Sequence, residues 1–380
     1  MNKNIVPDNF TMSMVIVDSF PVIFFSGTAI LVGVMLKNPV FIIGAIISAL
    51  SGILKVLWKL IVVKKKKNVW PLFIQMRIAM PIGFLLMIAG VIISRRTIHL
   101  LDVFKYVTGF PLVIFFGIGL ASMVAMMVLA ITLDSSKAKN NWIEQLVNGI
   151  GQFSIFIGVL ASLYFLDYYH ACNSLDVYKE TYNYSQIEDN NDYIYLKGID
   201  SDKLIIFYQG AKVEPMAYIP SLVGLNQEGV DVVIVKSPYN FANFNSNGAD
   251  EIIDIYGDKY EEIYIAGHSF GGFVASSYAS KNAGKIDGLI MEGAYSTDDL
   301  TNSGLKVLSM QGENDKVLHK NIADKCDANL PADYMKVIIN GGNHSQFGDY
   351  GFQAKDGEPT ITKEEQWEEI KNNIKIFVTK

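Results

Sequence analysis

The stretch that decides the fold runs from Glu262 to Gly272 and reads Glu-Ile-Tyr-Ile-Ala-Gly-His-Ser-Phe-Gly-Gly. The apolar run Ile263–Ala266 predicts a buried strand, and the small residues of Gly271–Lys281 predict a helix. Between them lies the pattern G-x-S-x-G, centred on Ser269. A serine on a sharp strand-to-helix turn exposes its hydroxyl, and the flanking glycines let neighbouring backbone pass close to it. In this context the pattern predicts a nucleophile elbow, with a structural Gly-Ser turn as the alternative.

An aspartate and a histidine later in the chain complete the hypothesis of a catalytic triad. Asp315 follows the predicted strand Lys306–Met310, and His344 follows the predicted strand Met335–Ile339. Serine, acid and histidine occur in that order in α/β-hydrolase triads. A serine hydroxyl needs a neutral imidazole to take its proton, and an ionised carboxylate holds that imidazole in the right tautomer. We therefore expect Ser269 as nucleophile, His344 as base and Asp315 as the orienting acid.

Neighbouring loops offer alternatives for the base and the acid. His319 is the second candidate for the base. Glu313, Asp298 and Asp299 are alternative acids, although turn and N-cap roles would explain all of these carboxylates equally simply. His268 occupies the variable position of the elbow, and we expect it to point away from the site of the base.

Backbone N–H groups are the expected oxyanion donors. Phe270 opens the helix after the nucleophile, and the loop after the predicted strand Leu204–Tyr208 supplies Ala211 or Gly210. We take five residues as candidates for the substrate pocket: Lys212, Tyr239, Phe241, Tyr295 and Phe347. Ordinary loop packing, or a solvated charge in the case of the lysine, would explain these residues equally well.

The two halves of the chain differ in charge and hydropathy. Through Tyr169 the chain is apolar and has 14 Lys and Arg against 6 Asp and Glu, a net charge of +8. From His170 onward, 18 Lys against 32 Asp and Glu give −14, and the whole chain has a net charge of −6. The hydrophobic content of 50% indicates membrane segments. The acidic half has no basic patch with interleaved aromatic residues, so we expect no nucleic-acid partner.

Five apolar stretches within residues 1–169 each reach the roughly 20 residues that a helix needs to cross the hydrocarbon core. They cover approximately residues 14–36, 39–63, 70–93, 107–133 and 142–168. Lys55 and Lys59 lie near a helix end, where we expect their side chains to extend toward water. Asp18 lies within the first apolar stretch. An anchor for the second half is the favoured role, with a sensor or transporter as the alternative.

Basic loop residues give an expected orientation. One side of the predicted membrane region has Lys3, the run Lys64–Lys67, Lys137 and Lys139. The other side has Lys37, Arg95, Arg96 and Lys105. The positive-inside rule places the tetralysine loop in the cytoplasm, so we expect a multi-pass plasma-membrane protein with its C-terminal domain outside.

From residue 192 onward, short strands alternate with helices, which predicts an α/β fold with a doubly wound, mostly parallel sheet. The expected strands are Tyr193–Leu196, Leu204–Tyr208, Val230–Val235, Ile263–Ala266, Leu289–Met291, Lys306–Met310 and Met335–Ile339. The expected domains are an all-α transmembrane region over 1–169, a juxtamembrane linker or first short strand over 170–191, and the α/β domain over 192–380.

From about Leu204 to the C-terminus the chain resembles the α/β-hydrolase fold-5 family, the dienelactone hydrolase-like enzymes. The resemblance lies in YQGAKVEPMAYIPSL, VVIVKSPYN, AGHSFGG, SGLKVLSMQGENDKV and INGGNHSQFGDYG. It implies that Ser269, Asp315 and His344 are the triad, and it covers none of the membrane half. Family members often have Gly-Gly where this chain has Gly210-Ala211, which leaves a backbone donor in place.

The connection after the expected strand Leu289–Met291 is short. About a dozen residues separate Met291 from Leu305, which leaves no room for the large cap domain of many hydrolases. Without a cap we expect an open pocket and a small ester or lipid-like substrate, with membrane lipids as neighbours of the chain.

The sequence thus predicts a membrane-anchored serine hydrolase that cleaves a carboxylic ester or thioester through an acyl-enzyme. No metal and no organic cofactor is implied. The alternatives are an acyltransferase that uses the same triad on a lipid or envelope acceptor, and a non-catalytic membrane sensor or transporter with a hydrolase-like ligand-binding domain.

Overall fold

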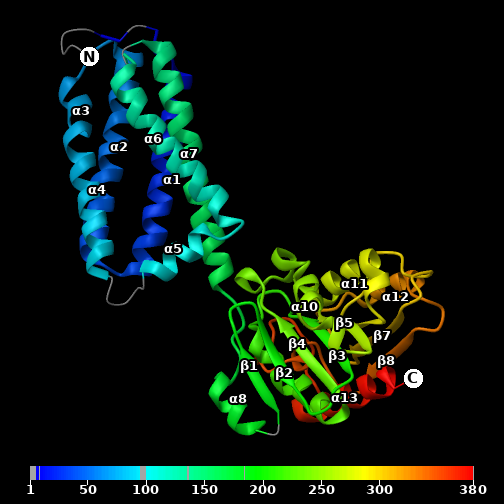
Figure 1. The fold of residues 1–380 in the computed structure, drawn as a ribbon. Coiled ribbons are helices and arrows are strands. Elements are labelled where there is room, and N and C mark those ends of the chain that lie inside the picture. The colour runs from blue at the N-terminus through cyan, green and yellow to red at the C-terminus, as the bar shows by residue number, and fades with distance from the viewer. Residues whose placement is uncertain (1–5, 8, 95–99, 135–136, 184, 380) are drawn as a thin grey trace. The chain divides into compact units, whose positions relative to one another are not determined.

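The computed structural model describes residues 6–7, 9–94, 100–134, 137–183 and 185–379 (Figure 1). The chain forms two compact units, Met1–Tyr164 and Phe165–Lys380. Lys3, Arg95 and Arg96, which enter the predicted orientation, lie outside the described residues.

The first unit is helical, as expected. Five of its helical segments are long and apolar enough to cross a membrane by length and composition. The helices of this unit are α1 (Met12–Leu36), α2 (Pro39–Lys65), α3 (Trp70–Ile74), α4 (Met76–Ile93), α5 (Leu100–Thr108), α6 (Leu112–Thr132) and α7 (Ala138–Leu166).

Two of the expected stretches differ in detail from these helices. The stretch 70–93 is divided at Gln75, whose side-chain amide donates to the carbonyls of Leu72 and Ser51. The stretch 107–133 yields a helix that begins only at Leu112, because the preceding Pro111 has no N–H to continue a helix from α5.

Helices α2 and α4 pack at backbone distance. A Cβ added to Gly44 would lie 2.5 Å from the carbonyl oxygen of Gly83, and one added to Gly83 would lie 2.7 Å from the carbonyl oxygen of Gly44. Only glycine permits this approach. Small residues allow apolar helices to pack closely in the same way in lipid, where the hydrophobic effect does not favour their association.

A buried ion pair joins α1 to α2. Lys59 and Asp18 are 0% and 3% exposed, and Nζ of Lys59 lies 3.0 Å from Oδ2 of Asp18. Lys59 also donates to Oδ1 of Asn141 on α7 at 2.8 Å. The expectation that Lys59 extends toward water is therefore wrong, because a carboxylate and an amide inside the bundle solvate its charge instead.

We predict that Asp18→Leu destabilises the first unit by about 3–5 kcal/mol, because it leaves the Lys59 ammonium buried without its carboxylate. Thermal unfolding of the full chain in detergent measures the change. The double variant Asp18→Leu/Lys59→Met should recover most of the loss, since both buried charges are then gone. Asp102→Leu, at an exposed acid of α5, is the control. Unfolding of Asp18→Leu at the temperature of this control would contradict the prediction.

The second unit is built on one sheet of eight strands in the order β1-β2-β4-β3-β5-β6-β7-β8. Strands β3 to β8 run parallel, and β1 and β2 join antiparallel at one edge. The strands are β1 (Gln186–Asp189), β2 (Tyr193–Lys197), β3 (Lys203–Tyr208), β4 (Val230–Val235), β5 (Glu262–His268), β6 (Gly288–Glu292), β7 (Lys306–Gly312) and β8 (Met335–Ile339). The predicted doubly wound, mostly parallel sheet is confirmed.

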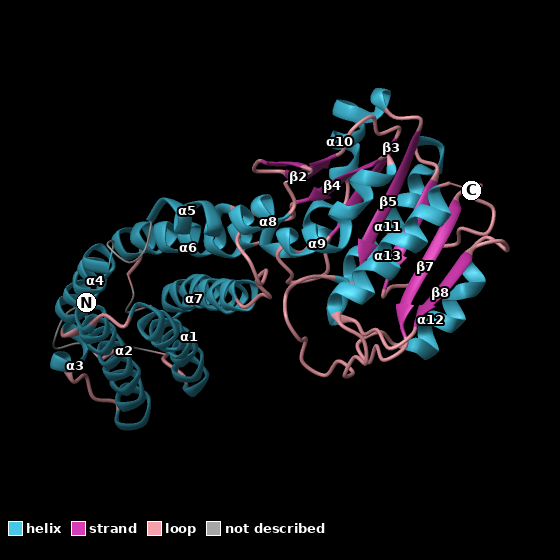
Figure 2. Cartoon of the chain, turned by 90° about the horizontal axis from the view of Figure 1, so that it is seen from below, coloured by secondary structure: helices cyan, strands magenta, loops and turns pink. Residues whose placement is uncertain are grey.

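Helices cover both faces of this sheet (Figure 2). Along β6, Ile290 packs into the core that includes α13, whereas Leu289 and Met291 pack into the core that includes α11. The helices are α8 (Leu175–Thr181), α9 (Ile219–Leu222), α10 (Gly248–Tyr256), α11 (Phe270–Asn282), α12 (Lys320–Cys326) and α13 (Lys363–Val378).

Two connections matter for the site. Between β3 and β4 the chain forms a single α-turn, α9, between the 3-10 segments Pro215–Tyr218 and Val223–Glu228. The segment 293–305, all of it described, contains neither helix nor strand, so no cap covers the carboxyl ends of the strands there.

Candidate active site

Ser269 lies on a strained turn between β5 and α11. Its φ of 53° and ψ of −122° place a non-glycine residue in a region that costs of order 1–3 kcal/mol. Its N–H donates to the carbonyl of Glu292 at 2.8 Å, which ties the turn to the end of β6. A Cβ on Gly271 would lie 2.2 Å from the carbonyl oxygen of Tyr208. The second glycine of the motif is therefore what allows β3 to pass beside the elbow.

His344 and Asp315 form a buried pair at the ends of β8 and β7. Nδ1 of His344 lies 2.8 Å from Oδ2 of Asp315, and their side chains are 1% and 0% exposed. The other carboxylate oxygen accepts the backbone N–H groups of Val317 and Leu318 at 2.9 and 2.8 Å. These bonds hold the carboxylate in place against the imidazole of His344.

The other nitrogen of the His344 imidazole belongs to a ring that lines a cavity together with Ser269. Nε2 of His344 is buried and has no hydrogen-bond partner among the described residues. His344 and Ser269 line the same cavity, of about 330 Å³. With the proton on Nδ1, Nε2 is an acceptor available to a hydroxyl group in that cavity.

The two alternatives for the second oxyanion donor differ in their contacts. The N–H of Gly210 donates to the hydroxyl of Tyr218 at 3.0 Å. Ala211 is the alternative that remains. Phe270 is the first residue of α11, a position whose N–H has no carbonyl one turn earlier in the helix to bond.

His268 does not point away from the base. Its ring lies 4.5 Å from that of His344, centroid to centroid, and stacks on Phe347 at 5.3 Å. Alternation along β5 places His268 on the same face as Tyr264 and Ala266, and the His344 loop crosses that face. Burial, with a smaller effect of His344, lowers the pKa of His268 well below its usual range, so this ring is neutral.

Glu292, at the end of β6, is a second buried acid next to the elbow. It is 0% exposed, and neither carboxyl oxygen has a hydrogen-bond partner among the residues that the structure describes. Burial raises the pKa of Glu292 from 4.5 to about 8. The group is therefore mostly a neutral carboxylic acid at neutral pH, in contrast to the hydrogen-bonded Asp315.

The cavity brings together some of the predicted pocket residues and leaves others elsewhere. Tyr295 and Phe270 line it, as does His319, which is exposed at the start of α12. Its further wall residues, which sequence reasoning did not select, are Phe273, Gly293, Ala294, Val317 and Leu318. Val317 and Leu318 follow Asp315 by two and three residues, and Gly293 and Ala294 come just after the predicted strand Leu289–Met291, so a place at a strand end is the sequence signal for these four.

The other candidates for the pocket have different neighbours. Phe347 is fully buried against His268. Tyr239 and Phe241 form an aromatic cluster with Phe165, at ring distances of 4.8 and 5.5 Å. Lys212 pairs with Asp167, Nζ to Oδ2, at 3.0 Å.

The segment that follows α7 is bonded to the loop 210–214, in which we expect the second oxyanion donor. The N–H of Tyr169 donates to the carbonyl of Lys212 at 2.6 Å, and the N–H of Glu214 donates to the carbonyl of Tyr169 at 2.9 Å. Tyr169 and Val213 thereby form a parallel bridge. With the Asp167–Lys212 pair, these bonds hold the loop from its outer side.

The alternative acids have local roles. Oε2 of Glu313 accepts the N–H of Gly341 at 2.8 Å, and Oδ1 of Asp299 accepts the N–H and hydroxyl of Thr301 at 3.0 and 2.6 Å. Asp298 donates its N–H to Ser296. In the described part of the chain, no group of three or more His, Cys, Asp and Glu residues is placed to hold a metal ion.

We predict that wild-type stability falls as pH rises from 6.5 to 8, and that Glu292→Gln flattens this decline. The folded state keeps the Glu292 proton up to about pH 8, whereas the unfolded state loses it near 4.5, so the folded state binds more protons in between. The buried His268 acts in the opposite direction, but mainly below its usual pKa of 6.5. Urea unfolding at several pH values measures the slope.

The control for this measurement is Glu313→Gln, at an exposed residue. The glutamine keeps a side-chain oxygen that can accept the N–H of Gly341. This variant should leave the slope as in the wild type. Equal slopes in the wild type and Glu292→Gln would contradict the assignment of Glu292 as a buried neutral acid.

Comparison with known proteins agrees with this architecture. Residues 204–368 match the model of a family described as the Alpha/beta hydrolase family. The α/β-hydrolase domain expected from the sequence is thereby confirmed for that part of the chain, and the match does not extend into the first unit. None of the curated proteins matches the chain.

Several solved structures are similar to the second unit. Est1E from Butyrivibrio proteoclasticus is 14% identical over 52% of this chain and 99% of its own, with a TM-score of 0.39. A predicted CIB-like hydrolase from Thermoplasma acidophilum is 16% identical over 51% and 96%, with a TM-score of 0.39. A soluble variant of monoglyceride lipase from Saccharomyces cerevisiae is 12% identical over 51% and 94%, with a TM-score of 0.38.

Proposed function

We propose that this chain is a membrane-anchored serine hydrolase that cleaves a carboxylic ester or thioester through an acyl-enzyme. One observation carries the proposal: the elbow serine and the unbonded Nε2 of His344, whose other nitrogen is held by Asp315, line one cavity. The family match over residues 204–368 supports a hydrolase of this architecture.

The reaction follows from the roles of these groups. The hydroxyl oxygen of Ser269 attacks the carbonyl carbon while its proton passes to Nε2 of His344. The N–H groups of Phe270 and Ala211 stabilise the negative charge on the carbonyl oxygen. The intermediate collapses to an acyl-serine, and His344 protonates the departing alcohol or thiol. Water then attacks the acyl-serine, gives its proton to His344, and the acid leaves as Ser269 recovers its proton.

The buried neutral histidine beside the base supports this assignment. A charged ring at His268, 4.5 Å from the ring of His344, would oppose the positive charge that His344 acquires in the reaction. Because burial keeps His268 neutral, that repulsion is absent.

Substrate and location follow from the cavity and the first unit. The cavity walls include Phe273, Val317 and Leu318, which suit an apolar acyl group, and the uncapped loop 293–305 suits an open entrance. Five helices of sufficient length and hydropathy support anchoring in a membrane. The basic loop Lys64–Lys67 supports a cytoplasmic position for that loop and an outer position for the hydrolase unit.

We predict that a fluorophosphonate probe labels the full chain at Ser269, because only an activated serine attacks the phosphorus at a useful rate. Intact-mass and peptide analysis locate the label. Ser269→Ala should abolish labelling, and Ser277→Ala, at a serine of α11 outside the cavity, should not. Labelling that survives Ser269→Ala would remove the assignment. Product analysis with added alcohols tests whether water is the preferred acceptor.

We also predict that Asp315→Asn lowers kcat for a p-nitrophenyl ester by roughly 10⁴-fold, because the amide no longer favours the required imidazole tautomer. Glu313→Gln, two residues earlier, should change kcat by less than about twofold. A small effect of Asp315→Asn, or an equal effect of Glu313→Gln, would transfer the acid role to another carboxylate. Esters of graded chain length then report the acyl preference of the cavity.

A further inference from the structure

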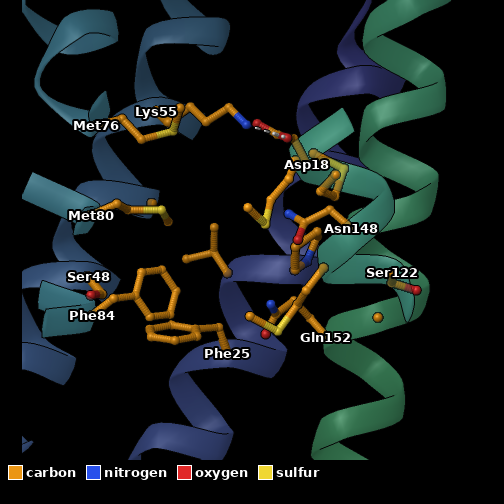
Figure 3. A pocket seen from close by; sticks show the side chains of 17 residues that line it. Asp18, Phe25, Ser48, Lys55, Met76, Met80, Phe84, Ser122, Asn148 and Gln152 are labelled. Atoms are coloured by element: carbon orange, nitrogen blue, oxygen red, sulfur yellow. Dashed lines mark ion pairs between the residues drawn. The ribbon is translucent and has the colours of Figure 1, made fainter. Parts of the chain in front are cut away.

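The first unit contains a cavity of its own, of about 290 Å³, lined by residues of α1, α2, α4, α6 and α7 (Figure 3). One end is polar: Nζ of Lys55 lies 3.5 Å from Oδ1 of Asp18, and the amide of Asn148 lies nearby. Toward the other end lie the rings of Phe25 and Phe84. The cavity is thus amphipathic within a bundle of apolar helices.

The two ammonium groups at the polar end are compensated to different extents. Asp18 is shared by two ammonium groups, Lys59 at 3.0 Å and Lys55 at 3.5 Å. Lys59 is fully buried and has further support from Asn141 and, electrostatically, from Glu144. Lys55 has the longer contact, is a quarter exposed, and lines the cavity. The positive charge of Lys55 is therefore the less compensated one, and it faces the open space.

The apolar wall is adaptable. It is formed largely by methionines, which are unbranched and polarisable and fit chains of different shape: Met76, Met80, Met123, Met126 and Met127. The volume of about 290 Å³ leaves room for an alkyl chain beside these side chains.

We propose that this cavity binds an amphipathic monoanion of the fatty-acid type, with its carboxylate on Lys55 and its chain along the methionine wall. An anion compensates the second ammonium group in a medium where an uncompensated charge is costly. A cationic amphiphile would be repelled by the ammonium group of Lys55, and a neutral alcohol would add no compensation to its charge. This site is separate from the proposed catalytic one and does not depend on it.

Displacement of radiolabelled decanoate from the full chain in lipid nanodiscs tests the proposal, with empty nanodiscs as the background. We expect saturable binding in which unlabelled decanoate displaces the label at a concentration at least tenfold lower than decanol or decyltrimethylammonium does. Absence of saturable binding, a preference below tenfold, or a preference for the cation would overturn the proposal. These three outcomes need no variant.

Variants then place the site. Lys55→Met should weaken decanoate binding at least tenfold and remove the preference over decanol, whereas Lys55→Arg keeps both. Met80→Trp should fill the cavity and weaken decanoate and decanol alike. The matched control is Lys64→Met, at an exposed lysine on the same helix, which should bind as the wild type. Unchanged decanoate binding in a folded Lys55→Met or Met80→Trp variant would overturn the proposed site. If one of these two variants unfolds, the other one and Lys55→Arg decide whether decanoate binds there.

Discussion

The close passage of three backbone segments around Ser269 is the constraint on which the rest of the site depends. A side chain on Gly271 would collide with the carbonyl oxygen of Tyr208, and one on Gly267 would lie 2.5 Å from the carbonyl carbon of Gly271. Main chain therefore packs directly on main chain where β3, β5 and α11 meet. The turn at Ser269 is therefore held by close packing of main chain on main chain rather than by adjustable side chains.

Two neighbouring acids at the strand ends are buried to the same depth but have different partners. Both oxygens of Asp315 have hydrogen-bond partners: the N–H groups of Val317 and Leu318 on one oxygen and the ring of His344 on the other. Glu292 has none among the described residues, and burial alone raises its pKa to about 8. The acid that contacts the histidine is therefore the hydrogen-bonded one, while His268 and Glu292 remain neutral beside it.

Local patterns predicted the parts of the fold that depend on local sequence. Short Val- and Ile-rich runs predicted seven of the eight strands, because burial on both faces makes such strands apolar throughout. The elbow and the loops of Asp315 and His344 were found because strand ends and turn residues mark them. The side-chain neighbours of Lys59 and His268 were not predictable in this way. Asp18 lies 41 residues from Lys59, and Tyr218 lies 50 residues from His268. The periodicity of the sequence carries no sign of contacts over such distances.

The pairing of Tyr169 with the loop 210–214 has a consequence for where the second unit can be cut from the first. The unit begins at Phe165, before the end of α7, and its first residues form part of the support of the oxyanion loop. A soluble fragment that starts at Cys172 would lack Tyr169, which forms the bridge to Val213, and Asp167, which pairs with Lys212. The residues that directly follow the final apolar helix therefore also support the loop 210–214, and a truncation intended to remove only the helices would alter that loop.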